Sequence, residues 1–120
     1  MGSRATLFND IDTMVPEAFA QHLAEDVTMR FGNAPPMHGR EACREAWAGF
    51  CELVDGVHHE VVNQWDVGDA TIAETAVTYT RKDGIGVTVP VVTIYRAAGE
   101  LIDEYRVFLD LTPVFADDPS

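Results

Sequence analysis

The sequence predicts an α+β domain in which short helices come first and a long run of antiparallel strands follows. Three observations carry this prediction. Apolar residues recur at helical spacing between residues 40 and 54. After residue 56, extended stretches with alternating polar and apolar residues replace that pattern. The short turn sequences Gly68-Asp69, Lys82-Asp83-Gly84 and Ala98-Gly99 separate these stretches, as in hairpins.

The N-terminal part predicts two short helices and one strand. The first helix covers residues 4–14, and Pro16 suits the first turn of a second helix at 16–24. Residues 27–31 predict a short strand, and the glycine and prolines of residues 32–36 predict a loop.

The strongest helix signal covers residues 40–54, and Gly56 is placed to end it. Four strand candidates follow, at 57–67, 70–81, 86–96 and 101–111. Because their connections are short, neighbouring strands should pair antiparallel. Pro90 predicts an edge position or a bulge in the third of these strands, since proline has no backbone N–H to donate.

The final strand predicts one apolar face and one mixed, charged face. Leu101, Tyr105 and Val107 fall on the first face, whereas Arg106 and Asp110 fall on the second. Such a strand is half buried, and it places ionisable groups beside an apolar cavity or a partner subunit.

Size and charge restrict the possible functions. The chain of 120 residues suits one domain, residues 1–120, and 47% hydrophobic residues argue against disorder. A net charge of −12 argues against binding to nucleic acid and to anionic membrane surfaces. No apolar run reaches the ~20 residues that span a bilayer, and the N-terminus lacks the apolar region of a secretory signal.

The cysteine and histidine spacings predict neither a disulfide nor a metal site. Cys43 and Cys51 would lie about 12 Å apart along one helix, too far for a disulfide. Free thiols indicate a reducing, cytoplasmic location. His58 and His59 are adjacent on a strand and point to opposite faces, so they cannot hold one ion together. No cofactor is expected.

The inward positions of the strands predict an apolar pocket with a few hydroxyls, which suits a small hydrophobic molecule. The side chains expected to contact it are Phe31, Trp47, Asn63, Trp65, Tyr79, Tyr105 and Val107. His59 shares the face of Trp65 and is a candidate acid or base. The alternative is that these side chains simply fill the core without a ligand-sized void.

Three phrases, in this order and spacing, resemble the nuclear transport factor 2-like superfamily and its SnoaL-like group. They are Phe19…Leu23-Ala24-Glu25-Asp26-Val27, then His38-Gly39-Arg40-Glu41, then Gly99 to Asp110. The resemblance covers nearly the whole chain. It implies a cone-shaped fold, with a strongly curved, mainly antiparallel sheet wrapped around three N-terminal helices.

Known catalytic sets of the superfamily are only partly compatible with this sequence. The acids of the ketosteroid isomerase pattern would fall at Phe31 and Val92, which cannot transfer a proton. The Asp–Arg–Asp set of the epoxide hydrolases is replaced by Thr75, Val77 and Val107. The polyketide cyclases use an acid from the last part of the sheet, which implies Asp110, or less well Asp103 or Glu104.

Two functional hypotheses therefore stand side by side. In the first, the protein is a cofactor-independent cyclase or isomerase, in which Asp110 exchanges a proton next to a carbonyl held by Tyr79, Tyr105 or Asn63. Asp110 would then be buried, with a raised pKa; the alternative is an ion pair with Arg106 or a cap on the backbone of residues 111–112. In the second, the protein is a non-catalytic hydrophobic-ligand binding or accessory module. The mixed outer face of the sheet predicts a homodimer.

Overall fold

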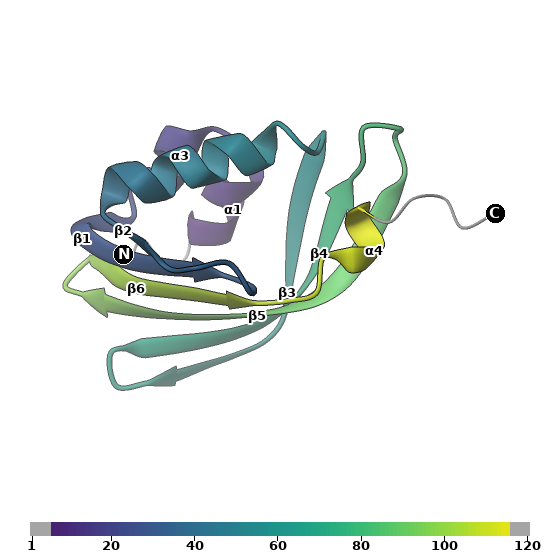
Figure 1. Cartoon of the computed structure of the whole chain (residues 1–120). Coiled ribbons are helices and arrows are strands. Elements are labelled where there is room, and N and C mark those ends of the chain that lie inside the picture. The colour runs from purple at the N-terminus through teal and green to yellow at the C-terminus, as the bar shows by residue number, and fades with distance from the viewer. Residues whose placement is uncertain (1–5, 116–120) are drawn as a thin grey trace.

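The computed structural model describes residues 6–115 and shows a curved six-stranded sheet with helices on its concave face (Figure 1). The strand order is β2-β1-β6-β5-β4-β3. The elements in chain order are α1 (Leu7–Asp12), α2 (Pro16–Ala20), β1 (Leu23–Phe31), β2 (Met37–His38), α3 (Arg40–Cys51), β3 (Gly56–Val67), β4 (Ala70–Thr80), β5 (Gly86–Ala98), β6 (Leu101–Phe108) and α4 (Thr112–Phe115).

The α+β class and the antiparallel meander β3-β4-β5-β6 are confirmed. The arrangement of three N-terminal helices is only partly matched, because β1 and β2 precede α3 and a fourth helix, α4, follows β6. The second helix ends at Ala20, short of the predicted residue 24, since Leu23 already pairs with Ile102 of β6. Residues 4 and 5 of the first predicted helix lie outside the described residues.

Strand β1 pairs with β6 in parallel, so the first and last strands lie side by side. Met29 pairs with Tyr105, and Phe31 pairs with Val107. On its other edge, β1 pairs antiparallel with the short β2. The parallel pairing of β1 with β6 makes the sheet mixed, and β1 separates β2 from the C-terminal strand.

A register shift in β6 corrects the predicted pattern of its first residues. The pairing of β5 with β6 shifts between Arg96 and Ala97. As a result Ile102 is 2% exposed, whereas Leu101 is 38% exposed. An extra residue in one strand turns the following side chains to the other face. The predicted inward direction of alternate side chains is therefore confirmed for Tyr105 and Val107 but is wrong for Leu101.

Pro90 lies in an internal strand, at a point where that strand is locally an edge. Its Cα partner is Ala76 of β4. On the other side, β6 pairs with β5 only from Val92 onward. A residue without an N–H is tolerated there because β6 has no hydrogen bond to receive from it.

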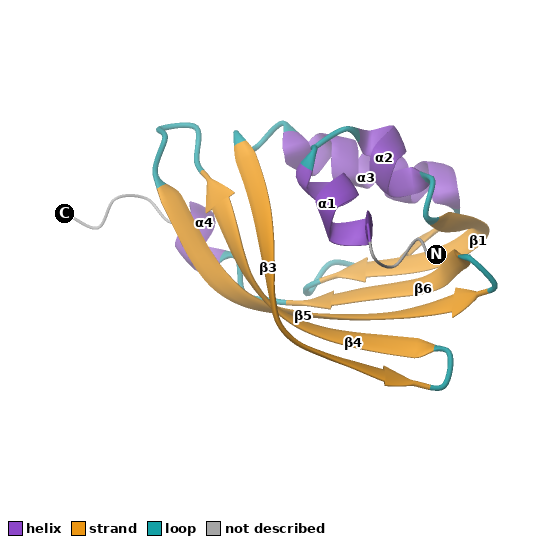
Figure 2. Ribbon diagram, turned by 180° about the vertical axis from the view of Figure 1, so that it is seen from behind, coloured by secondary structure: helices purple, strands orange, loops and turns teal. Residues whose placement is uncertain are grey.

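The helices cover only part of the sheet, and the core lies under them (Figure 2). The far part of the β3–β4 hairpin extends beyond the helices, and apolar side chains of its β3 strand are exposed: Val61, Val62, Trp65 and Val67. Within residues 6–115, no helix is long and apolar enough to cross a membrane.

Candidate functional site

A small cavity lies between the helices and the concave face of the sheet. Its volume is about 40 Å³. It is lined by Ile11, Phe19, Phe31, Trp47, His59, Tyr79, Val91, Thr93, Tyr105 and Val107. One water needs roughly 10–15 Å³, so the cavity accepts a small polar group but not a whole ligand of the usual size.

His59 lines this cavity and is held by Asp12, the last residue of α1. The imidazole Nδ1 lies 2.6 Å from Asp12 Oδ1, and the backbone N–H of His59 donates to Asp12 Oδ2 over 2.8 Å. The His59 ring also stacks on Phe8, with ring centroids 4.7 Å apart. The side chains of both partners are largely buried, 8% exposed for His59 and 16% for Asp12. Two contacts thus fix the ring, and a third holds its backbone.

The Asp12 contact determines the chemistry of the ring. A carboxylate oxygen only accepts hydrogen bonds, so we assign the proton of the neutral ring to Nδ1 of His59. The lone pair is then on Nε2, and the ring can act as a base there. A nearby carboxylate also stabilises the imidazolium that forms when Nε2 takes a proton.

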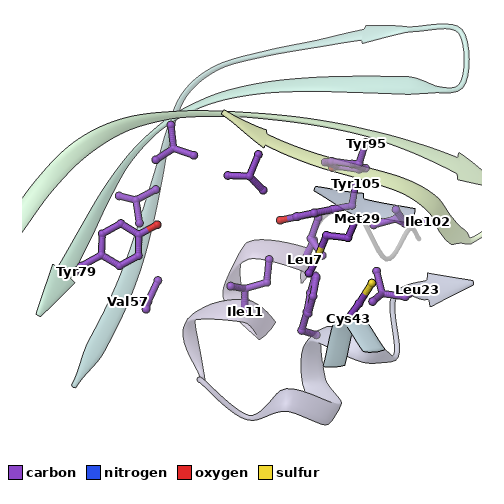
Figure 3. Close-up of a cluster of buried hydrophobic side chains, with 14 of the residues drawn as sticks. Leu7, Ile11, Leu23, Met29, Cys43, Val57, Tyr79, Tyr95, Ile102 and Tyr105 are labelled. Carbon is purple, nitrogen blue, oxygen red and sulfur yellow. The ribbon is translucent and has the colours of Figure 1, made fainter. Parts of the chain in front are cut away.

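Two tyrosines supply hydroxyl groups on the sheet side of the cavity. Figure 3 shows the hydroxyls of Tyr79 on β4 and Tyr105 on β6 facing each other across the interior. Burial raises the pKa of both hydroxyls far above the usual value, with the charge of Asp12 acting in the same direction. A hydrogen bond with the Thr93 side chain opposes this rise in the pKa of Tyr105. Both groups stay protonated and can donate to an oxygen atom.

A second His–Asp pair uses the same helix but lies outside this cavity. His22 Nε2 is 2.8 Å from Asp10 Oδ2. The His22 side chain is 3% exposed, and its other ring nitrogen, Nδ1, is buried without a hydrogen-bond partner among the described residues. The backbone oxygen of His22 accepts from Ile102 N over 2.8 Å. This pair ties α1 to the start of β1.

Across residues 6–115, no group of three or more His, Cys, Asp or Glu side chains is placed to hold a metal ion. Burial raises the pKa of the Cys51 thiol to about 11, and it also raises that of Cys43. Both cysteines are free thiols, and at neutral pH they stay protonated.

The sequence model of one protein family, described as the SnoaL-like domain, matches residues 5–105 of this chain. The chain belongs to the SnoaL-like domain family. No curated protein matches its sequence at significant similarity.

Solved structures show the same fold as this SnoaL-like domain. A hypothetical protein from Catenulispora acidiphila DSM 44928, with a ketosteroid isomerase-like fold and bound trimethylamine, has a TM-score of 0.86 at 22% identity, over 97% of this chain and 92% of that one. A protein from Jannaschia sp. CCS1, described as a SnoaL-like polyketide cyclase, has a TM-score of 0.80 at 20% identity, covering 92% and 85%. An epoxide hydrolase from M. tuberculosis has a TM-score of 0.78 at 13% identity, covering 93% and 83%.

The SnoaL-like fold brings most of the predicted side chains to one cavity. Those that line it are His59, Phe31, Trp47, Tyr79, Tyr105 and Val107. Asn63 and Trp65 do not, because the part of β3 that carries them extends beyond the helices. Asn63 Nδ2 donates to Glu74 Oε1 over 3.0 Å, and Trp65 is 49% exposed.

Asp110, the acid expected from the last strand, lies outside this cavity. β6 ends at Phe108, and the exposed Asp110 accepts a hydrogen bond from the backbone N–H of Thr112 over 3.0 Å. The side chain and backbone of Thr112 lower the pKa of Asp110. The expected burial and raised pKa are therefore wrong, and the alternative, a cap on the following backbone, is what the structure shows.

Sequence reasoning missed Asp12, the carboxylate that holds His59. The signal was present, because Asp12 follows Phe8 by four residues and both therefore lie on one face of α1. An acid on the apolar face of a short helix indicates a buried polar partner. That partner lies forty-seven positions further along the chain, so the local pattern could not identify it.

Proposed function

We propose that this SnoaL-like domain is a cofactor-independent enzyme in which His59 moves a proton next to a carbonyl group. The observation that carries the proposal is the 2.6 Å contact between His59 Nδ1 and Asp12, made by a ring that lines the cavity. An acid–base pair at a small, mainly apolar cavity is the arrangement that general-base catalysis uses. The proposal moves the catalytic role from Asp110 to His59.

The proposed step begins with His59 Nε2 as the base. Nε2 takes a proton from the carbon next to the carbonyl, and the electron pair of that C–H bond moves toward the carbonyl oxygen to give an enolate. Tyr79 and Tyr105 are the donors placed to hydrogen-bond that oxygen. Asp12 stabilises the imidazolium. In a β,γ-unsaturated ketone the enolate is conjugated, and return of the proton from His59 to the γ carbon completes an isomerisation. In a diketone, attack of the enolate carbon on the second carbonyl closes a ring, and the resulting alkoxide takes the proton from His59.

A different observation favours the second candidate function, a non-catalytic binding module. The cavity of about 40 Å³ is small, and most of its lining is apolar. In that case His59 and Asp12 serve to hold α1 on β3, and the same cavity binds without reaction. The two functions differ in one measurable property, namely whether substitution of His59 removes a reaction or only weakens packing.

The proposed enzymatic activity is tested by the exchange of solvent deuterium into 1-indanone, a flat ketone that can form an enolate. NMR measures the exchange. We expect His59→Gln to lower the protein-dependent exchange by roughly 100-fold or more, the scale of lost general-base catalysis. His38→Gln is the matched control, because His38 is exposed on β2, its ring contacts Thr28, and it is not among the residues that line the cavity. Circular dichroism and the thermal midpoint of each variant establish that it is folded.

Exchange by the wild type that His59→Gln leaves unchanged contradicts the assignment of His59. Exchange that is absent from the wild type with 1-indanone and with the methyl ketones used below favours the binding module.

A further inference from the structure

We infer that the molecule bound here has an elongated, neutral, apolar tail, and that this tail lies in a groove beside the cavity. The inference rests on the proposed function, because the carbonyl head of the same molecule would sit at His59. It goes further by naming a second subsite and the class of compound that fits both, an open-chain ketone with an alkyl or polyene tail.

The groove runs between α3, β1 and the loop that joins β1 to β2. Its volume is about 290 Å³, several times that of the cavity. Every residue that lines it is apolar: Met29, Phe31, Ala34, Met37, Ala46, Trp47, Phe50 and Leu53. A cavity that accepts only a small head group therefore lies beside a groove that offers room for the rest of a ligand.

Phe31 and Trp47 line both the groove and the cavity, so they form a shared wall. The wall continues into the groove through Phe50, which stacks on Trp47 with centroids 5.5 Å apart and packs against Phe31 at the same distance. Rotation of two partly buried aromatic side chains would connect the head and tail subsites. A single ligand can therefore occupy both.

Trp47 provides an independent observation at this junction. Its indole Nε1 is buried and has no hydrogen-bond partner within the described part of the chain. A buried donor without a partner costs free energy, and most buried donors in folded proteins are paired. An oxygen atom of a ligand seated between the cavity and the groove would satisfy this N–H. The aromatic wall therefore favours a molecule with an oxygen near the start of its tail.

The composition of the groove specifies the tail. Flat faces from Trp47 and Phe50 suit a planar or extended hydrocarbon, and the flexible thioethers of Met29 and Met37 adapt to its shape. An all-apolar lining offers nothing to a charged tail, whose desolvation would be uncompensated. The net charge of −12 further disfavours anionic ligands.

A series of methyl ketones of increasing length tests the tail subsite. The background variant Trp65→Phe leaves Trp47 as the only indole, because the chain has two tryptophans and Trp65 is exposed outside the cavity. Quenching of Trp47 fluorescence by 2-butanone, 2-heptanone and 2-undecanone then gives three affinities. We expect each added methylene to tighten binding by up to roughly fourfold until the groove is full, as burial of a CH₂ group predicts.

Filling the groove should remove this dependence on length. Ala46→Leu places a larger side chain in the groove but not in the cavity, and Ala34→Leu does so from the loop, where folding of α3 is not affected. Both should weaken binding of 2-undecanone by about tenfold or more, the loss of several buried methylenes, and leave 2-butanone unchanged. Ala42→Leu is the matched control on the exposed side of the same helix.

The outcomes separate this inference from the proposed function. Length-dependent binding that the Ala46 and Ala34 variants abolish supports the tail subsite, even where deuterium exchange is absent. Exchange that depends on His59 but is equally efficient for all three ketones overturns the tail subsite and leaves the proposed function in place. Affinities that do not change with length also overturn the inference, as does an equal effect of Ala42→Leu.

Discussion

Helix α1 carries two carboxylates, and each holds a histidine, but the two pairs have different surroundings. Asp10 meets His22 over 2.8 Å, and Asp12 meets His59 over 2.6 Å. In both pairs the histidine side chain is mostly buried. Only His59 lines the cavity, and only its ring is stacked on an aromatic neighbour, Phe8, among the ring contacts of residues 6–115.

The difference shows what makes an acid–base pair useful for chemistry. A carboxylate beside one ring nitrogen orients the histidine in either case. Function then depends on what the other nitrogen meets. For His22 that nitrogen is buried without a described partner, so the pair can stabilise the fold but cannot transfer a proton to a ligand. For His59 the ring lines a cavity that accepts a small polar group of a ligand.

The largest expected effect comes from Asp12→Asn. An amide cannot stabilise an imidazolium and would favour the wrong tautomer of His59, so deuterium exchange should fall roughly 100-fold. Asp10→Asn is the matched control on the same helix and should change the exchange rate little. Exchange rates of both variants at neutral pH measure the contrast, and equal losses would remove the distinction between the pairs.

The next effect concerns stability instead of exchange. His22→Gln should lower the free energy of unfolding by about 1–3 kcal/mol, the cost of breaking a buried hydrogen-bonded pair. Urea denaturation measures this loss. The activity of the folded variant should match the wild type, since His22 is not among the residues that line the cavity. A drop in exchange per folded molecule would show that the two pairs are coupled through α1.

The dependence of stability on alkaline pH tests the two tyrosines on the sheet side of the cavity. Tyr79 and Tyr105 have pKa values raised above the unfolded value of 10.0. The folded state therefore keeps a proton that the unfolded chain loses above that pH. Its free energy of unfolding should fall by about 1.4 kcal/mol per pH unit for each tyrosine. Tyr105→Phe should remove one such contribution. Urea denaturation at pH values from about 9 to about 11, around the usual pKa of tyrosine, would detect the difference.

The smallest effect is expected for Asp110→Asn. Asp110 is exposed and caps the backbone of Thr112, so deuterium exchange should not change. The pKa of this carboxyl is lowered in the folded state. Its small stabilisation is therefore present above the unfolded pKa and is lost as the pH falls through the folded pKa. Thermal midpoints of wild type and variant should converge in acid, and a large loss of exchange would restore Asp110 as the catalytic acid.

The sequence predicted the sheet well because its information is local. Alternating side chains and short turns predicted β3 to β6 and their antiparallel pairing. The boundary between α2 and β1 was wrong, since Leu23 is recruited by a strand from the other end of the chain. The register shift that turns Ile102 inward depends on how β5 pairs with β6. The alternation of side chains along one strand does not predict such a shift.

The site was predictable only where it followed the faces of strands. Tyr79, Tyr105 and Val107 reach the cavity because they lie under the helices, whereas Asn63 and Trp65 lie on the part of β3 that extends beyond them. How far the helices extend is a property of packing, and no local pattern encodes it. The homodimer and the cytoplasmic location stay predictions.

The parallel pairing of β1 with β6 also has a consequence for folding. The hairpins between β3 and β6 join strands that are neighbours in sequence. Strand β1 can pair with β6 only after the last strand has formed. Contacts between distant parts of a chain form at a higher entropic cost. We therefore expect the meander to gain protection from hydrogen exchange first, and α1 to dock with β1 afterwards. Asp10 ties α1 to His22, just before β1, so we expect Asp12 to reach His59 in this later step.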